Sequence, residues 1–275
     1  MKVAFLMHGA VSPPSGRIIT EKLEYLGINS YVNYRATKIG IQKHIIDVNP
    51  TCSFDFFLHS WSFPIEKELT ELYNPIVSLF ENNESYRDMI FSRIKKTRGV
   101  DKKRYNHYSK TLSIKKVTEL FQTYNKSYDV VIFYRYDILL MKDMILNQYD
   151  LSKVWFNKDS KLIPWRIKNP HISYGGDFYF IMNYENALNF GLNLYDSLSE
   201  KIKPNDHQFM IPYITQCMKK EAAEDDIDNM KDLAVIRLLK KINLSKSFLA
   251  EYGLTEEEVN SYTAENHINE STRLK

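Results

Sequence analysis

The sequence is poor in the residues that mark several common classes of protein. It holds only two cysteines, Cys52 and Cys217, which are far apart in a chain of 275 residues. Such a pair gives neither a disulfide framework nor the close spacing of a zinc site. The N-terminal apolar run, residues 3–7, is shorter than a signal-peptide core, and no later run approaches the ~20 residues of a membrane-spanning helix. We therefore expect a soluble cytoplasmic protein without a membrane span.

Glycine is scarce as well, with nine in the whole chain. Neither Gly-x-Gly-x-x-Gly nor Gly-x-x-x-x-Gly-Lys-Ser/Thr occurs, which argues against a dinucleotide-binding Rossmann enzyme and a P-loop kinase. The net charge is only +3, although residues 87–126 hold twelve Lys or Arg against three Asp or Glu. This basic stretch could face an anionic ligand or form a solvated helix surface. No nucleic-acid motif accompanies it, so we predict no nucleic-acid partner.

What the chain does have is short strand-like runs that alternate with helical patterns. Residues 130–134 are all β-branched or aromatic, and residues 2–7 and 54–61 are similar runs. A continuous apolar run of this length is typical of a strand buried on both faces. Apolar spacing of three and four predicts helices over residues 36–48, 66–72, 105–124 and 184–198. The alternation predicts an α/β fold, with a mainly parallel mixed sheet flanked by helices in a single Rossmann-like domain.

Three further expectations concern local structure and boundaries. Residues 83–104 are polar and weakly periodic, which predicts a loop or an irregular helix. On the helix that follows, the pattern puts Lys110, Lys115 and Lys116 on the side opposite the apolar residues. We expect the main domain to cover residues 1–215, and residues 216–275 to form a partly helical extension packed on it.

Candidate site residues follow the ends of the predicted strands. His8 and Gly9 follow the first strand, and Arg135 and Asp137 follow the central one. Residues at i and i+2 of a strand share a face, and open α/β sheets bind ligands beyond the carboxyl ends of their strands. Alternatives are that His8 is a polar cap, and that Arg135 and Asp137 form an ion pair that closes the strand. Asp177 follows two glycines that indicate a backbone bend, or a β-bulge that Asp177 caps.

The order of three segments resembles a poorly characterised set of bacterial and large-virus glycosyltransferases with a GT-A-type fold. The segments are residues 55–61 followed by 72–75, residues 128–131 leading into 135–137, and residues 176–180. The similarity covers about residues 1–215. It implies that a sugar nucleotide lies across the carboxyl edge of the sheet. In that fold an Asp-x-Asp motif commonly holds a divalent ion against the diphosphate.

The resemblance also implies roles for individual residues. Only Asp137 matches the Asp-x-Asp motif, because Arg135 stands where its first aspartate would be. Asp137, with His207 as a later ligand, could bind Mn²⁺ or Mg²⁺, or Arg135 could instead neutralise the diphosphate by a bidentate contact. The remaining candidates are His8, Gly9, Arg17 and Tyr136 for the nucleotide, and Asp177 and Asp206 as the base or acceptor-binding residues. Asp206 could alternatively be a helix N-cap.

The predicted function is transfer of a hexose or pentose from a nucleotide sugar, with UDP-sugars favoured, to a hydroxyl of a glycan acceptor with the help of a metal ion. One alternative is a non-catalytic module of the same fold that binds a sugar or nucleotide. Another is a nucleic-acid-binding protein that uses the basic stretch. If the protein is viral, its expected location is the host cytoplasm.

Overall fold

A seven-stranded sheet forms the centre of the molecule. The computed structural model describes residues 1–11, 33–98, 102–158, 177–198, 210–228, 231–235 and 244–259. The strands of the sheet lie in the order β3-β2-β1-β4-β7-β6-β8. Their bounds are Val77–Phe80 for β3, Ser53–Ser60 for β2, Lys2–Gly9 for β1, Val130–Arg135 for β4, Tyr179–Met182 for β7, Val154–Lys158 for β6 and Ala222–Asp228 for β8.

The strand directions confirm a mixed, mainly parallel sheet. β1, β2, β3 and β4 are parallel to one another, and β7 runs antiparallel to both β4 and β6. From β1 the chain adds β2 and β3 on one side, and then places β4 on the other side of β1. The strand order therefore reverses between β1 and β4. In open α/β sheets such a switch point is where a crevice for ligands forms, outside the carboxyl ends of the strands.

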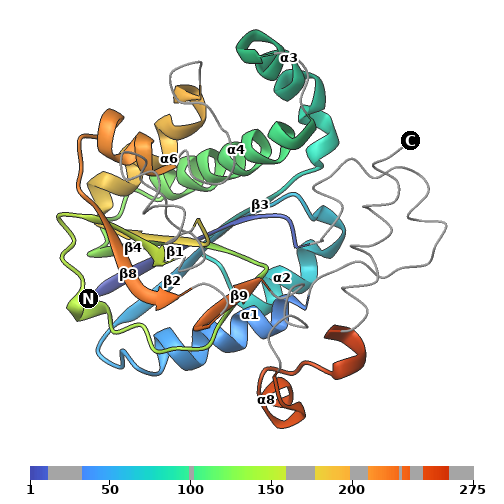
Figure 1. Ribbon diagram of the computed structural model, residues 1–275, viewed down its shortest axis with the longest axis vertical. Helices are drawn as coiled ribbons and strands as arrows, with labels where there is room; N and C mark the ends of the chain where they lie inside the picture. Colours follow the sequence, from blue (N-terminus) through green and yellow to red (C-terminus); the bar gives the residue numbers. More distant parts are fainter. Residues whose placement is uncertain are drawn as a thin grey trace, which may run out of the picture.

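Helices cover both faces of the sheet (Figure 1). Helices α3 (Arg87–Arg98), α4 (Lys102–Thr123) and α6 (Tyr184–Ser197) lie on one side, and α1 (Tyr34–Ile41) and α2 (Glu66–Tyr73) lie on the other. The side chains of β1 alternate between the two: Ala4 and Leu6 join the core beneath α4, whereas Phe5 joins the core beneath α1. Every residue of the predicted central run, 130–134, has no exposed surface. The predicted burial of this strand on both faces is thus confirmed.

The structure differs from the sequence expectations in two segments. The predicted loop or irregular helix at residues 83–104 is a 3₁₀ turn, Asn83–Tyr86, followed by the regular helix α3 and the start of α4. The acidic stretch after residue 221, which has no strand-like hydrophobic pattern, forms β8 at the edge of the sheet. Acidic residues have low strand propensity, but at an edge they can project into water, and tertiary context overrides the propensity.

The C-terminal part of the described chain packs beside α1. A second sheet joins β5 (Ile138–Leu140) to β9 (Leu233–Val235), and helix α8 (Lys246–Glu251) lies outside α1 in Figure 1. The Tyr252 hydroxyl is 2.7 Å from His44 Nε2, and Leu249 and Tyr252 share a core with Ala36. Residues 216–235 thus contribute strands to both sheets; the predicted boundary at residue 215 stays a prediction.

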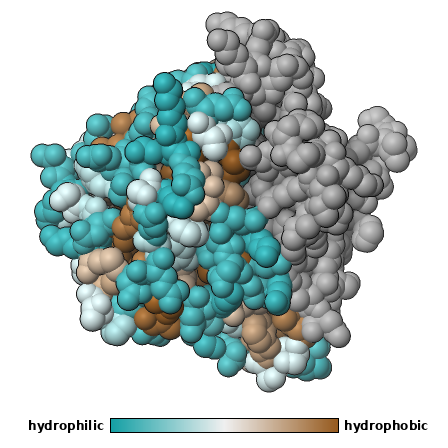
Figure 2. Space-filling view, turned by 60° about the vertical axis from the view of Figure 1, so that its left-hand side comes forward, coloured by the Kyte–Doolittle hydropathy of each residue, from teal (hydrophilic) through white to brown (hydrophobic). Residues whose placement is uncertain are grey.

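The face in Figure 2 is mainly hydrophilic, with small, separate hydrophobic areas. Within the described residues, no helix combines the length and the apolar character needed to cross a membrane.

Helices α4 and α6 approach each other closely at Gly191, and this contact gives a stability prediction. A Cβ at position 191 would lie 1.9 Å from Thr118 Oγ1 and 2.6 Å from Thr118 Cβ. Thr118 is short and its hydroxyl donates to Ile114 O at 2.7 Å, so it has little freedom to move away. Ala is about 1 kcal/mol better than Gly in a helix, but overpacking costs about 1–3 kcal/mol or more.

We therefore expect Gly191→Ala to lower the free energy of unfolding by about 1–2 kcal/mol in urea denaturation. The control is Asn193→Ala, an exposed position on the same helix, with an expected change within about 0.5 kcal/mol. A Gly191→Ala variant as stable as the wild type would contradict the close approach of α4 and α6.

Candidate active site

The structure brings three segments together at the carboxyl edge of the sheet. His8 at the end of β1 is the register neighbour of Arg135 at the end of β4. Asp177 lies two residues before β7, and because β7 is antiparallel to β4, its first residues lie at the edge where β4 ends. The predicted site residues His8, Arg135 and Asp177 thus meet at the switch point, although 169 positions separate the first from the last (177 − 8).

Arg135 and Asp137 form a bidentate ion pair. Arg135 Nε donates to Asp137 Oδ1 at 2.9 Å, and Nη2 donates to Oδ2 at 2.7 Å. The alternative of an ion pair at the strand end is confirmed, whereas β4 ends at Arg135 and Asp137 lies in the turn that follows it. Two parallel N–H···O bonds fix both the position and the orientation of the guanidinium. Arg135 also lies over the Phe178 ring, 5.3 Å from its centroid, so its plane is held from two sides.

A third charged pair comes from helix α4. The ammonium group of Lys110 donates to Asp177 Oδ2, and Arg135 Nη1 lies 3.9 Å from Asp177 Oδ1. The Asp177 side chain is only 4% exposed and that of Lys110 is 12% exposed. Of the two alternatives for the basic stretch, a solvated helix surface does not apply to Lys110, because α4 is buried on nearly all sides and the lysine reaches the sheet edge. Lys110 is the main site residue that sequence reasoning missed.

His8 is a neutral group among these charges. Its side chain is buried, and burial, with Lys110 and Arg135 nearby, holds its pKa well below the usual value of 6.5. At neutral pH the imidazole is therefore uncharged. Among the described residues, His8 Nδ1 has no hydrogen-bond partner. His8 can thus offer a ligand a polar contact without adding charge.

Two other predicted nucleotide-binding residues have structural roles. Both backbone polar groups of Gly9 are engaged within the protein: its N–H donates to Ser113 Oγ at 2.8 Å, and its carbonyl accepts from Trp61 N at 3.1 Å. Its φ of +103° explains why glycine is needed at this turn. The Tyr136 side chain, in the turn after β4, is fully buried in the core beneath α1 and α2.

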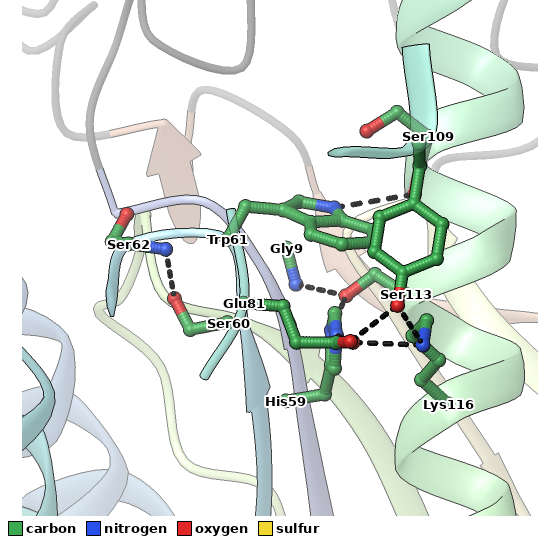
Figure 3. A network of polar contacts seen from close by, with 10 residues as sticks. Gly9, His59, Ser60, Trp61, Ser62, Glu81, Ser109, Ser113 and Lys116 are labelled. Atoms are coloured by element: carbon green, nitrogen blue, oxygen red, sulfur yellow. Dashed lines mark hydrogen bonds and ion pairs between the residues drawn. The ribbon is translucent and has the colours of Figure 1, made fainter. Parts of the chain in front are cut away.

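A second polar network ties the neighbouring strand ends to α4 (Figure 3). His59 Nδ1 is 2.6 Å from Ser113 Oγ, and its Nε2 is 3.1 Å from Glu81 Oε2. Glu81 also pairs with Lys116 Nζ at 2.8 Å and accepts from the Tyr86 hydroxyl. Because a carboxylate can only accept, Nε2 of a neutral His59 carries the proton and Ser113 donates to Nδ1.

Ser113, His59 and Glu81 are linked in the order of a catalytic serine-histidine-acid triad, but they do not form one. Burial lowers the pKa of His59, so the ring is neutral. Ser113 is fully buried and its oxygen already accepts the Gly9 N–H, so no substrate can reach it. Its role is to fix the turn after β1, next to the charged cluster.

The described carboxylates do not fit a divalent cation. Asp137 is bound on both oxygens by Arg135, and Asp177 lies between Lys110 and Arg135. A dication held by Asp137 would lie beside these two cations, and at 4 Å even two unit charges repel by about 4 kcal/mol at an effective dielectric constant of 20. Among the described residues, no three His, Cys, Asp or Glu side chains are arranged to hold a metal ion.

Three predicted site residues, Arg17, Asp206 and His207, lie outside the described residues. Their roles in nucleotide binding, catalysis and metal binding stay predictions.

A cavity of about 820 Å³ lies elsewhere, between α3, α4 and the end of α6. Its cations already have partners: Arg93 and Lys115 pair with Asp196, and Lys116 pairs with Glu81. It shares no residue with the cluster at the switch point, so we do not place the donor there.

The network around Glu81 gives a prediction on pH dependence. Burial alone would raise the pKa of Glu81, but hydrogen bonds from His59, Lys116 and Tyr86 outweigh it and lower the pKa from 4.5 to about 2. A lowered carboxyl pKa stabilises the fold above the unfolded-state value, and this stabilisation is lost as the pH falls from 4.5 towards 2.

Glu81→Gln should therefore lower Tm at pH 7, by the equivalent of about 1 kcal/mol after allowing for solvent screening, and the difference from wild type should shrink below pH 4.5. Thermal unfolding followed by circular dichroism between pH 7 and pH 3 measures this. Glu84→Gln, which removes the exposed pair with Arg87, is the control and should change Tm less. A Glu81→Gln difference that is constant over the whole pH range would refute the coupling.

Comparisons with known proteins find similar solved structures but no similar sequence. No protein-family profile and no curated protein sequence matches the chain. Solved structures do resemble it, and they are glycosyltransferases. Mouse xyloside xylosyltransferase 1 has 12% identity and a TM-score of 0.42 over 84% of this chain and 87% of its own. The galactosyltransferase LgtC, solved with donor and acceptor sugar analogues, has 13% identity and a TM-score of 0.41 over 83% and 75%.

A third similar structure is a glycosyltransferase involved in glycosylation of the major capsid of PBCV-1. It has 9% identity and a TM-score of 0.38 over 92% of this chain and 97% of its own. At these identities and scores the likeness is one of chain arrangement and does not extend to substrates. The α/β fold with its mixed, helix-flanked sheet is confirmed by the strand topology.

Proposed function

We propose that the protein is a glycosyltransferase that moves a sugar from a nucleotide-sugar donor to a hydroxyl of a glycan acceptor. The observation that carries the proposal is the charged cluster at the switch point: Lys110, Arg135, Asp137 and Asp177, with neutral His8 beside them. Its groups come from β1, β4, α4 and the start of β7, and they meet where open α/β sheets bind ligands.

The chemistry of sugar transfer explains the cationic side of the cluster. When the bond from the anomeric carbon to the diphosphate breaks, negative charge develops on the leaving phosphate. Fixed positive groups at that position stabilise the transition state more than the ground state. The Arg135 guanidinium is held by Asp137 and Phe178, so it is already oriented for a phosphate. UDP is our preferred nucleotide, as the sequence resemblance implies.

The acidic side of the cluster suits the acceptor. An acceptor hydroxyl needs a hydrogen-bond acceptor close to the anomeric carbon, and Asp177 is the proposed residue, with Asp206 the second candidate. A carboxylate between two cations is weakly basic, which favours binding of the hydroxyl over removal of its proton. The metal-assisted form of the reaction, with Asp137 and His207 as ligands, stays a prediction that the present pairing of Asp137 does not support.

The alternative function is a non-catalytic module that binds a sugar or a nucleotide with the same cluster. The buried ion pairs do not distinguish the enzyme from the binding module, because both functions need a site for an anion. Turnover separates the two: a binding module gains thermal stability with a nucleotide but releases no product.

The test is release of nucleoside diphosphate from a panel of UDP-sugars and GDP-sugars, with and without Mn²⁺. We expect the wild type to hydrolyse one donor slowly without an acceptor. The double variant Arg135→Ala/Asp137→Ala, which removes the pair without leaving an unpaired charge, should lower this rate by about 100-fold or more.

The matched control is Lys142→Ala/Asp226→Ala, which removes a surface ion pair of 2.9 Å outside the cluster and should leave the rate unchanged. Circular dichroism establishes that both variants are folded. Full turnover in the Arg135/Asp137 variant would exclude this cluster as the active site, and a wild type that binds a nucleotide but never hydrolyses a donor would favour the binding module.

A further inference from the structure

We infer that Lys110 and Arg135 together bind the donor diphosphate in place of a divalent cation, with Asp177 and Asp137 as their counter-ions. This inference rests on the proposed function, and it assigns the role of the metal to two side chains. It also adds Lys110, a residue of helix α4, to the donor site.

The positions of the two cations allow one anion to contact both. Lys110 reaches the site from α4 and Arg135 from the end of β4, and the Asp177 carboxylate bridges them. One of its oxygens accepts from Lys110, and the other lies 3.9 Å from Arg135 Nη1. A group as small as a carboxylate therefore spans the two cations. A diphosphate, which carries more oxygens over a greater length, can replace Asp177 at both contacts.

The balance of charge favours an anion over a metal ion. Among the described residues, the two cations and two carboxylates cancel, and His8 beside them is neutral. A divalent cation at Asp137 would have to displace the guanidinium from both carboxylate oxygens and leave a second buried cation, Lys110, nearby. A phosphate instead exchanges one anionic partner for another. With Nε and Nη2 of Arg135 held by Asp137, Nη1 remains for a phosphate oxygen, and Lys is a common phosphate-binding point charge.

The cluster is mostly buried, but three of its four charged side chains reach the surface. The side chains of Arg135, Asp137 and Lys110 are 15%, 13% and 12% exposed, whereas Asp177 behind them is 4% exposed. A ligand thus meets the cations before it meets Asp177. Once a phosphate takes over Lys110, Asp177 loses one neighbouring positive charge and becomes a better proton acceptor. The acceptor hydroxyl would then find a competent base only after the donor has bound.

Isothermal titration calorimetry tests the replacement of the metal. The wild type is titrated with UDP, GDP and inorganic pyrophosphate, once in EDTA and once in Mn²⁺. We expect one nucleoside diphosphate to bind with a Kd that differs by less than about threefold between the two conditions. Binding only in Mn²⁺ would overturn this inference and leave the proposed function intact. No binding of any nucleotide in either condition would instead count against the proposed function itself.

A charge-balanced variant tests the part played by Lys110. Lys110→Met/Asp177→Asn removes the buried ion pair without leaving a lone charge, and should weaken nucleoside diphosphate binding in EDTA by about 10- to 100-fold, the loss of a charge-assisted contact. The control is Lys115→Met/Asp196→Asn, which removes a more exposed Lys–Asp pair of the same helix, with no expected change in Kd. Unchanged binding in the Lys110/Asp177 variant, with native circular dichroism, would remove Lys110 from the donor site.

Discussion

The requirement that buried charges be paired organises this structure. Removing a charged group from water is costly unless an opposite charge and hydrogen bonds compensate it. Lys110, Arg135, Asp137 and Asp177 meet this requirement together at one point of the sheet edge. Among the described residues, each of the four has its charged partner within the cluster. Stability alone does not require such an arrangement, because apolar residues of similar size in place of a buried ion pair often give an equal or higher free energy of unfolding. Its position at the switch point is therefore better explained by chemistry than by folding.

Helix α4 is the element that makes this arrangement possible. Along one helix, Lys110 pairs with Asp177, Ser113 holds the turn at Gly9, and Lys116 pairs with Glu81. These residues are three apart, so they recur on one side of the helix, facing the ends of β1, β2 and β3. Contacts along one side of the helix therefore fix the positions of the strand ends relative to one another. Elsewhere on α4, Thr118 packs closely against Gly191 of α6.

Much of the architecture could be predicted from local patterns, and the site could be predicted only in part. The runs at residues 2–7, 54–61 and 130–134 are short and lack helical spacing, and this predicted their placement as strands. Arg135 and Asp137 were identified because side chains two residues apart on a predicted strand share one face. Lys110 was missed because a lysine in a basic stretch is usually a surface residue. Its burial depends on Asp177, a partner 67 positions away (177 − 110), and a helix pattern contains no information on that distance.

Strand β8 was missed for a related reason, and its composition has a consequence for self-association. It ends the sheet, and four of its seven residues are Glu224, Asp225, Asp226 and Asp228. The outer strand of a sheet is a template on which another chain can add a strand and begin aggregation. Asp225 is buried against Tyr149 and Tyr179, so two copies that met along β8 would bring the carboxyl groups of Glu224, Asp226 and Asp228 close to those of the second copy. Repulsion between these carboxylates disfavours the addition of another chain to this edge of the sheet. The acidic residues that weaken the strand propensity of β8 thus also disfavour aggregation.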